Sequence, residues 1–386
     1  MPRLPHQIRY IHSFVASDLE KKMVFLGGPR QVGKTTLALS LLQPFDKKHP
    51  AYFNWDYPAA RKILLSAELP ADHPLFVLDE VHKYRHWRNL VKGLYDHYGD
   101  DHQILVTGSA RLDYYRRGGD SLLGRYHYLR LHPFSFPEIR ASSPGDLDTL
   151  LEFGGFPEPL LSQDRRTWRR WSEERKTRLI QDDLRSLEQV REISQIEHLM
   201  ALLPDRVGSV LSIRSLVTEI QASHEAVSRW VTILDHLYYS FRISPYGPPR
   251  TKAVKKEQKL FLWDWSEVAD PGARLENLVA SQLLKFCHFR QDTEGHHMEL
   301  RFIRDTEGRE VDFVVLQDAK PLFAVECKSG DRELSRSVRY FAERSKIPIF
   351  YQLHRGSTER KILVGKTPVH ILPLVKWLSD PERPLP

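Results

Sequence analysis

Apolar and polar positions in the first part of the chain alternate between short continuous apolar runs and helical spacings. Apolar runs at 24–26, 51–53, 75–78 and 104–106 each lead into glycine or polar residues. Between them lie helix-forming segments, which we expect at Arg9–Lys22, from Leu37 to Leu42 and from Pro58 to about Glu68. Buried runs joined by helices are typical of parallel sheets. The pattern predicts an α/β domain at the amino-terminal end.

The pattern changes further along the chain. Asp164 to His198 is helical and charged, and the two helices expected at Ile213–Ile220 and from His224 to about Leu237 are separated by a break at Ala222 and Ser223. Apolar and polar residues then alternate with a period of two in 309–316 and 322–328. This alternation predicts an antiparallel hairpin folded about Ala319. The second part is therefore expected to contain a helical region and an α+β domain.

A glycine-rich stretch follows the first apolar run: Gly28-Pro29-Arg30-Gln31-Val32-Gly33-Lys34-Thr35-Thr36. Two glycines at this spacing before Lys-Thr, between a strand and a helix, are the pattern of a phosphate-binding loop. The backbone N–H groups of such a loop and the positive end of the next helix attract an anion. Lys34 is expected to reach the β- and γ-phosphates of ATP, and the Thr35 hydroxyl to hold Mg²⁺.

Two carboxylates, Asp79 and Glu80, follow the apolar run 75–78. The carboxyl ends of parallel strands share one edge of a sheet, so both are expected near the loop. Asp79 is assigned to the Mg²⁺ shell, through water. Glu80 is assigned as the base that orients and deprotonates the attacking water.

Three further residues are candidates around the same site. Thr107 and Ser109 follow the run 104–106 and are candidates to sense the γ-phosphate or to position water, with a helix cap at Ser109 as the alternative. Arg125, before an expected strand at 126–130, is a candidate arginine finger for a neighbouring subunit's nucleotide, or a surface cation.

Taken in order, Gly-Pro-Arg-Gln-Val-Gly-Lys-Thr-Thr-Leu, Leu-Asp-Glu-Val-His-Lys, Thr-Gly-Ser-Ala, Leu-Gly-Arg and Phe-Gly-Gly-Phe-Pro-Glu-Pro-Leu form a set of motifs. The chain thereby resembles the bacterial and archaeal AAA+ ATPases fused to a carboxyl-terminal domain of unknown function. In that family the tail resembles a restriction-endonuclease-like fold. The resemblance extends over nearly the whole chain and implies an architecture more securely than a biological role. By analogy with AAA+ modules, self-association is also expected.

Basic residues gather on the segment 165–178, which contains Arg165, Arg166, Arg169, Arg170, Arg175, Lys176 and Arg178. This run lines a nucleic-acid channel or forms a solvated helix face. The helix pair that follows has the outline of a winged helix-turn-helix, with His224, Ser228 and Arg229 facing outward where a recognition helix reads bases. Winged helices also serve as protein-contact modules, so both interpretations stay open.

In the expected hairpin, Asp312 lies opposite Glu326 and Glu310 opposite Lys328. Facing carboxylates repel each other unless a positive charge lies between them. A divalent metal held by Asp312 and Glu326 fits this need, with Glu276 completing the shell and Lys328 steadying an attacking water or phosphate.

This arrangement resembles the Asp…Glu-x-Lys pattern of PD-(D/E)XK nucleases, although no proline precedes Asp312. The alternative is an ordinary exposed hairpin in which Lys328 pairs with Glu310. A one-residue slip at the turn would also separate the predicted ligands.

Composition adds three constraints. The length of 386 residues suggests two or three domains. The net charge of +7 favours a polyanionic partner, of which DNA is our first expectation. Two cysteines, no apolar run of membrane-spanning length and no signal-peptide pattern in Met1–Tyr10 favour the cytoplasm and no membrane partner.

We therefore predict an AAA+ ATPase domain at 1–140, a helical lid and linker at 141–198, a winged helix at 199–258 and a nuclease-like domain at 259–386. The predicted function is a Mg²⁺-dependent ATPase that acts on nucleic acid, with metal-dependent cleavage by the last domain left open. The alternative is a nucleotide-switched regulatory or remodelling ATPase whose last domain is an inactive binding module.

Overall fold

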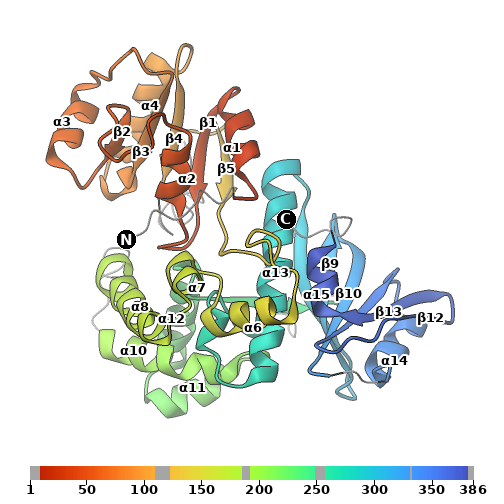
Figure 1. The fold of residues 1–386 in the computed structure, drawn as a ribbon. Coiled ribbons are helices and arrows are strands. Elements are labelled where there is room, and N and C mark those ends of the chain that lie inside the picture. Colours follow the sequence, from red (N-terminus) through yellow and green to blue (C-terminus); the bar gives the residue numbers. More distant parts are fainter. Residues whose placement is uncertain (1–8, 109–121, 185–191, 248–256, 331–332, 381–386) are drawn as a thin grey trace. The chain divides into compact units, whose positions relative to one another are not determined.

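A computed structural model of the chain describes residues 9–108, 122–184, 192–247, 257–330 and 333–380. The chain separates into two compact units. Figure 1 labels the helices and strands. Unit 1 comprises Met1–Pro133, Glu174–Gln189 and His236–Tyr238. Unit 2 comprises Phe134–Glu173, Val190–Asp235 and Tyr239–Pro386.

Unit 1 contains a five-stranded sheet in the order β2-β3-β4-β1-β5, and every pairing in it is parallel. Its strands are β1 (Met23–Gly27), β2 (Tyr52–Asn54), β3 (Leu75–Asp79), β4 (Gln103–Thr107) and β5 (Tyr126–Arg130). Its helices include α1 (His12–Leu19), α2 (Lys34–Ser40), α3 (Pro58–Ser66), η1 (Val81–Lys83) and α4 (Trp87–Tyr98). β1 and β3 are buried along their whole length, as continuous apolar runs predict. The predicted parallel-sheet domain is confirmed.

Unit 2 begins with a helical region. Its elements are α6 (Pro144–Phe153), α7 (Pro157–Ser162), α8 (Arg165–Arg178), α10 (Ile193–Leu202), η3 (Leu203–Arg206), α11 (Ile213–Ile220) and α12 (His224–His236). The last residues of α8, from Glu174 on, and the π-helical turn η2 (Leu179–Leu184) that follows belong to unit 1. Ser143 caps α6 in a reciprocal capping box with Asp146, and Ser212 caps α11. The predicted bounds of α11 are confirmed, and α12 begins at the predicted residue.

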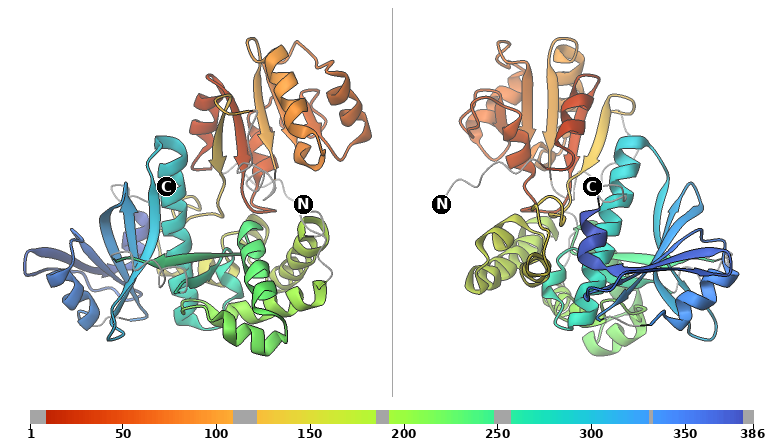
Figure 2. Two further views of the ribbon diagram at one scale, coloured as in Figure 1. Left: turned by 180° about the vertical axis from the view of Figure 1, so that it is seen from behind. Right: turned by 45° about the vertical axis from the view of Figure 1, so that its right-hand side comes forward.

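The rest of unit 2 is built on an eight-stranded mixed sheet in the order β12-β13-β11-β10-β9-β8-β6-β7. The strands are β6 (Ser240–Pro245), β7 (Lys259–Leu262), β8 (Met298–Arg304), β9 (Glu310–Gln317), β10 (Lys320–Lys328), β11 (Phe350–His354), β12 (Arg360–Val364) and β13 (Thr367–Pro373). The accompanying helices are η4 (Trp265–Glu267), α13 (Pro271–Glu294), α14 (Arg336–Arg344) and α15 (Leu374–Ser379). The long helix α13 packs against β7 to β10. It is the long teal helix in both views of Figure 2.

Two strands connect the helix pair α11–α12 to this sheet. β6 follows α12, pairs antiparallel with β7 and pairs parallel with β8. Two helices followed by a two-stranded ribbon are the element order of a winged helix. The ribbon crosses residue 258, where the sequence suggests a domain boundary. The winged-helix and nuclease-like assignments stay predictions.

The hairpin β9–β10 has the predicted register next to its carboxylates. Asp318 and Ala319 have φ angles of 51° and 63°, which form a tight two-residue turn. This turn alone would place Asp312 opposite Val325, but a bulge between Pro321 and Phe323 shifts the register by one residue. Phe313 then pairs with Val325, and Asp312 falls opposite Glu326, as predicted.

The basic helix α8 is largely solvent-exposed. Arg165, Arg166, Arg169, Arg170 and Arg178 are exposed, whereas Arg175 is buried and its Nη2 donates to the Tyr238 carbonyl at 3.2 Å. The exposed members agree with a solvated face, and the channel interpretation stays a prediction.

Across the described part of the chain, no helix is both long and apolar enough to span a bilayer.

Candidate functional site

The loop between β1 and α2 has the backbone that a phosphate-binding loop requires. Gly28 has a φ of 133°, and a Cβ there would lie 2.4 Å from the Leu131 carbonyl oxygen. Gly33 has a φ of 101° and is the N-cap of α2, so only glycine adopts both positions without strain. The loop therefore turns at its two glycines and delivers Lys34 to the first turn of a helix.

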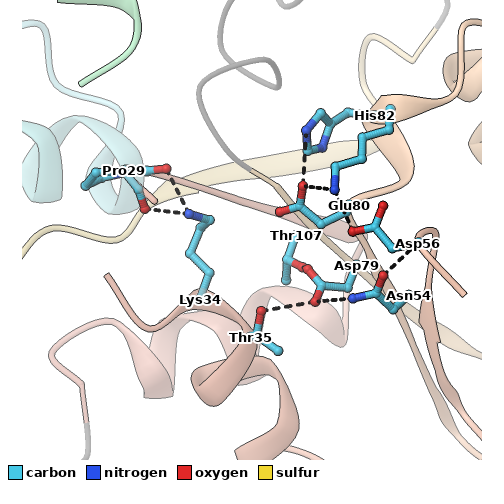
Figure 3. Close-up of polar contacts among 11 residues, drawn as sticks. Pro29, Lys34, Thr35, Asn54, Asp56, Asp79, Glu80, His82 and Thr107 are labelled. Atoms are coloured by element: carbon cyan, nitrogen blue, oxygen red, sulfur yellow. Dashed lines mark hydrogen bonds and ion pairs between the residues drawn. The ribbon is translucent and has the colours of Figure 1, made fainter. Parts of the chain in front are cut away.

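Lys34 already contacts this loop. Its Nζ donates to the carbonyls of Gly28 at 2.9 Å and Pro29 at 2.6 Å (Figure 3). A buried side chain positions this ammonium group beside the backbone curve in which the predicted phosphates would bind. Among the other loop residues, Val32 is buried, Arg30 and Gln31 are partly buried and Thr36 is exposed.

Asp79 is the centre of a buried hydrogen-bond network. Thr35 Oγ1 donates to Asp79 Oδ2 at 3.0 Å, and the fully buried Thr107 hydroxyl donates to Oδ1 (Figure 3). The Tyr52 hydroxyl donates to Oδ2 at 2.5 Å, and Asn54 Nδ2 lies 3.5 Å from the same oxygen. Burial, and then the charge of Asp79, raise the pKa of Tyr52 well above its ordinary value, so Tyr52 stays a donor. Thr107 thus orients Asp79, while a contact of Thr107 with a γ-phosphate stays a prediction.

Glu80 lies directly after Asp79, with a φ of 59°. Its Oε2 is 3.4 Å from Lys83 Nζ and 3.6 Å from His82 Nε2, and Lys83 also pairs with Asp56 at 2.6 Å (Figure 3). A left-handed conformation is costly for glutamate. The contact with Lys83 holds the carboxylate of the predicted catalytic base beside Asp79, at the carboxyl ends of the strands.

Arg125 lies at the amino-terminal end of the strands, at the opposite end from the phosphate-binding loop. The next residue, Tyr126, pairs with Met23 at the amino end of β1, and Arg125 Nε contacts Asp96 Oδ1 at 3.2 Å. Four strand steps of about 3.3 Å separate this end from Gly27, or roughly 13 Å. Arg125 is thus directed away from the loop of its own chain, and the finger role in a neighbouring subunit stays a prediction. Ser109, the other candidate sensor, lies outside the described residues.

The residues around the loop fit a magnesium ion by their chemistry. Thr35 and Asp79 supply a hydroxyl and a carboxylate oxygen 3.0 Å apart, and hard oxygen donors are the ligands that Mg²⁺ prefers. With both groups already oriented by hydrogen bonds, the donor set agrees with the predicted metal role.

A second group of charges forms in unit 2 around Lys259, which the sequence analysis did not single out. Lys259 Nζ lies 2.5 Å from Glu310 Oε1, 3.1 Å from Glu276 Oε1 and 3.8 Å from Asp312 Oδ1. Only 2% of its side chain is exposed. We call these four residues the Lys259 cluster.

Glu326 and Lys328 lie beside the Lys259 cluster. Lys328 Nζ pairs with Glu326 Oε1 at 2.5 Å, so the alternative in which Lys328 pairs with Glu310 is wrong. Asp312 Oδ2 accepts a hydrogen bond from the Cys327 backbone N–H at 2.8 Å. Glu326 Oε2 is buried and has no hydrogen-bond partner. Asp312, Glu326 and Lys328 therefore lie on one face of the hairpin, as the alternation predicts.

Burial, and then the neighbouring Asp312 charge, raise the pKa of Glu276 to about 8 and that of Glu326 to about 7. Burial also raises the pKa of Asp312. For Lys259, burial lowers the pKa, but the charges of Glu276, Asp312 and Glu310 outweigh that effect and raise it above the ordinary value. Lys259 is therefore a permanent cation among crowded carboxylates.

A metal between these carboxylates fits the donor chemistry but not the spacing. Glu276, Asp312 and Glu326 offer hard oxygens. However, no three acidic, histidine or cysteine side chains among the described residues are grouped so that they could hold a metal ion. The Lys259 ammonium supplies the positive charge that the sequence analysis assigned to a metal. The metal-ligand roles stay predictions.

The candidate DNA-reading residues lie on one side of α12. His224 and Arg229 are exposed and Ser228 is partly exposed, while Val227 and Trp230 are fully buried. The helical spacing predicts this outward orientation. A role of the three residues in contacting nucleic acid stays a prediction.

Several residues of these sites were not predicted from the sequence. Tyr52 and Asn54 end an expected strand beside Asp79, so their position at the shared sheet edge was a usable signal. Arg9 lies before α1, and its buried guanidinium donates to the carbonyls of Val32 at 2.7 Å and of His132. Neither Arg9 nor Lys259 belongs to a recognisable motif.

Comparison with known families supports the assignment of unit 1. Residues 20–140 match the model of the AAA domain, which supports an ATPase of the AAA type. Residues 144–268 match a domain of unknown function, DUF8612, and residues 271–374 match another, DUF4143. This agrees with the resemblance to AAA+ ATPases that carry a carboxyl-terminal domain of unknown function. The restriction-endonuclease-like fold of that domain stays a prediction.

Two curated relatives come from Methanocaldococcus jannaschii. The uncharacterized protein MJ1637 is 24% identical over 340 residues, covering 72% of this chain and 70% of that protein. The uncharacterized protein MJ1544 is 22% identical over 365 residues, covering 84% and 80%. A solved structure of the Aeropyrum pernix ORC1 protein in complex with DNA covers 72% of this chain and 93% of that chain, at 14% identity and a TM-score of 0.32. A similarity at that TM-score carries no argument about fold or function.

Proposed function

We propose that this protein is a Mg²⁺-dependent ATPase of the AAA type whose second unit acts on nucleic acid. The observation that carries the ATPase part is the contact between Thr35 and Asp79, 3.0 Å long, beside a loop on which Lys34 already lies. These are the groups that hold magnesium and the phosphates in phosphate-loop ATPases, and they come from two separate elements, the first turn of α2 and the end of β3.

In this proposal Lys34 leaves the carbonyls of Gly28 and Pro29 and binds the β- and γ-phosphates of ATP. Thr35, and Asp79 through water, would hold a magnesium ion, which would neutralise charge on the phosphates. Glu80 takes the proton of the attacking water, and for this its carboxylate must be released from Lys83 and His82. Arg125 of a neighbouring copy completes the site, which makes the active form a homo-oligomer.

The nucleic-acid part is supported by charge and by helix orientation. The chain carries a net charge of +7, and DNA is the polyanion that a helix-turn-helix pair most often binds. His224, Ser228 and Arg229 are placed on the accessible side of α12. We further propose that the last domain cleaves nucleic acid in a metal-dependent reaction.

One observation favours a second candidate function. Lys259 lies where a catalytic metal would be needed, within 3.1 Å of Glu276 and 2.5 Å of Glu310. A buried, permanently charged lysine competes with a metal ion for the same carboxylates. This favours a nucleotide-switched regulatory or remodelling ATPase in which the last domain binds a partner without cleaving it.

ATP turnover in the presence of magnesium tests the first proposal, with single-stranded, duplex and branched DNA added in turn. Lys34→Ala should abolish ATP binding at the phosphate-binding loop. Glu80→Gln should keep ATP binding and lower turnover by roughly 10²- to 10⁴-fold, the usual contribution of a general base. Lys62→Ala and Glu68→Gln are the matched controls, because both side chains are exposed.

Absence of ATP binding in the wild type, or normal turnover in Glu80→Gln, would contradict the proposal. Stimulation by one form of DNA would support action on nucleic acid. DNA nicking that is lost in Asp312→Ala and kept in Lys34→Ala would establish the nuclease and refute the inactive-module candidate.

A further inference from the structure

Unit 2 contains a pocket of about 480 Å³ that belongs to neither site described above. Four arginines line it, Arg165, Arg169, Arg274 and Arg355, together with Trp168. They come from α8, from the first turns of α13 and from the residue after β11. We call this the arginine pocket. Its volume falls in the range of about 300–1,000 Å³ that small-ligand sites occupy.

Two of the four positive charges are already compensated. Arg165 pairs with Glu152, and Arg355 pairs with Asp148, and both acids line the same pocket. Such exposed pairs neutralise charge but add little stability. The arginine pocket therefore depends on its other two guanidinium groups for any net charge.

Arg169 and Arg274 provide that net charge. In the described part of the chain Arg169 forms no ion pair or hydrogen bond through its side chain, and Arg274 uses only its Nε, which donates to the Val268 carbonyl at 2.6 Å. This bond fixes the direction of the Arg274 guanidinium and leaves both Nη groups available. Two uncompensated guanidinium groups on one small pocket favour a compact, multiply charged anion such as phosphate.

Trp168 adds an aromatic surface whose position is fixed. Its Nε1 donates to Ser266 Oγ at 2.9 Å, and Ser266 Oγ donates to Asp264 Oδ1 at 2.6 Å. A ring held in this way can stack with the base of a nucleotide, which adds roughly 1–3 kcal/mol per base in single-strand binding proteins. An acidic peptide would use the arginines but not this surface.

From these observations we infer that the arginine pocket binds a nucleotide unit, with its phosphate on Arg169 and Arg274 and its base on Trp168. The unit is a free nucleotide or the phosphorylated end of a nucleic-acid strand. The strand-end source rests on the proposed action on nucleic acid, whereas the free-nucleotide source does not.

The test uses the full chain carrying Lys34→Ala, so that the phosphate loop does not bind the probe. The probe is a short single-stranded DNA with a 3′ fluorescent label, with or without a 5′-phosphate, and binding is followed by fluorescence anisotropy. The 5′-phosphate should tighten binding by about 10- to 100-fold, as expected for charge-assisted hydrogen bonds. Arg169→Gln combined with Arg274→Gln should remove that gain.

Arg170→Gln is the matched control, because Arg170 is an exposed neighbour on α8 that does not line the pocket. It should keep the gain from the 5′-phosphate. Circular dichroism melting of each variant separates loss of binding from loss of folding. AMP should compete with the probe in either case; AMP that binds as tightly as the phosphorylated strand would identify a free nucleotide as the ligand, and AMP that binds much more weakly would identify the strand end.

The inference is overturned if the 5′-phosphate has no effect, if Arg170→Gln loses the gain equally, or if an acidic peptide displaces the probe as well as a phosphorylated strand does. ATP turnover of the wild-type chain, measured without DNA, tests the proposed ATPase independently of this pocket. Failure of the pocket inference is thereby distinguished from failure of the proposed ATPase.

Discussion

Replacing Lys259 by methionine tests whether its ammonium group holds the carboxylates of unit 2 together. Methionine keeps the length of the side chain and removes its charge. Glu310, Glu276 and Asp312, whose oxygens lie 2.5, 3.1 and 3.8 Å from Nζ, then face one another without a cation. Removing one partner from a buried ion pair costs about 3–5 kcal/mol.

Thermal unfolding at pH 8 measures this cost. For units of about 150–250 residues each kcal/mol lowers the midpoint by roughly 2–4 °C, so the expected fall is about 6–20 °C. Lys320→Met is the control, because Lys320 is exposed beside the hairpin turn, and it should change the stability by less than about 0.5 kcal/mol.

The cost should depend on pH in a definite direction. Glu276 and Glu326 have pKa values raised to about 8 and about 7, so they take up protons as the pH falls toward 5. Protonated carboxyls no longer repel, and the difference between Lys259→Met and the wild type should narrow. A variant as stable as the wild type at pH 8 would refute the reasoning.

Two other predictions follow from the described contacts. Tyr52→Phe removes the hydroxyl that donates to Asp79 at 2.5 Å, and should lower the unfolding free energy by about 1.5–3 kcal/mol in urea titrations, while Tyr57→Phe, at an exposed ring, should not; equal stability of both would contradict a role for Tyr52 in orienting Asp79. If α12 contacts DNA, Arg229→Gln should lower the salt dependence of binding by about one counterion relative to Lys320→Gln, and an unchanged slope would remove Arg229 from the interface.

The parts of the fold that the sequence predicted are those governed by local patterns. Continuous apolar runs and the spacing of Gly28, Gly33 and Lys34 predicted a parallel sheet with a phosphate-binding loop. Alternation in the hairpin predicted that Asp312 faces Glu326, and the structure reaches that register through a tight turn and a compensating bulge. The bulge was not predicted, because alternation indicates which residues share a face near the carboxylates but not how the turn that joins the two strands is built.

Long-range contacts escaped the sequence because no spacing encodes them. Tyr52 reaches Asp79 only because β2 and β3 pair, and Lys259 reaches Glu276 and Glu310 only because β7 lies beside α13 and the sheet. The sequence predicted a divalent metal between Asp312 and Glu326, which stays a prediction, and no spacing pointed to Lys259 beside Glu276 and Glu310. The lysine came from a strand assigned no chemistry.

The strand β7 also limits how this protein can be divided. The match to the last domain begins at residue 271, after β6, β7 and Lys259. A fragment cut there would expose the side of β8 that pairs with β6 and would strip the acidic side chains of their counterion. Any exchange of this module between proteins, in evolution or in the laboratory, would have to carry the preceding ribbon with it.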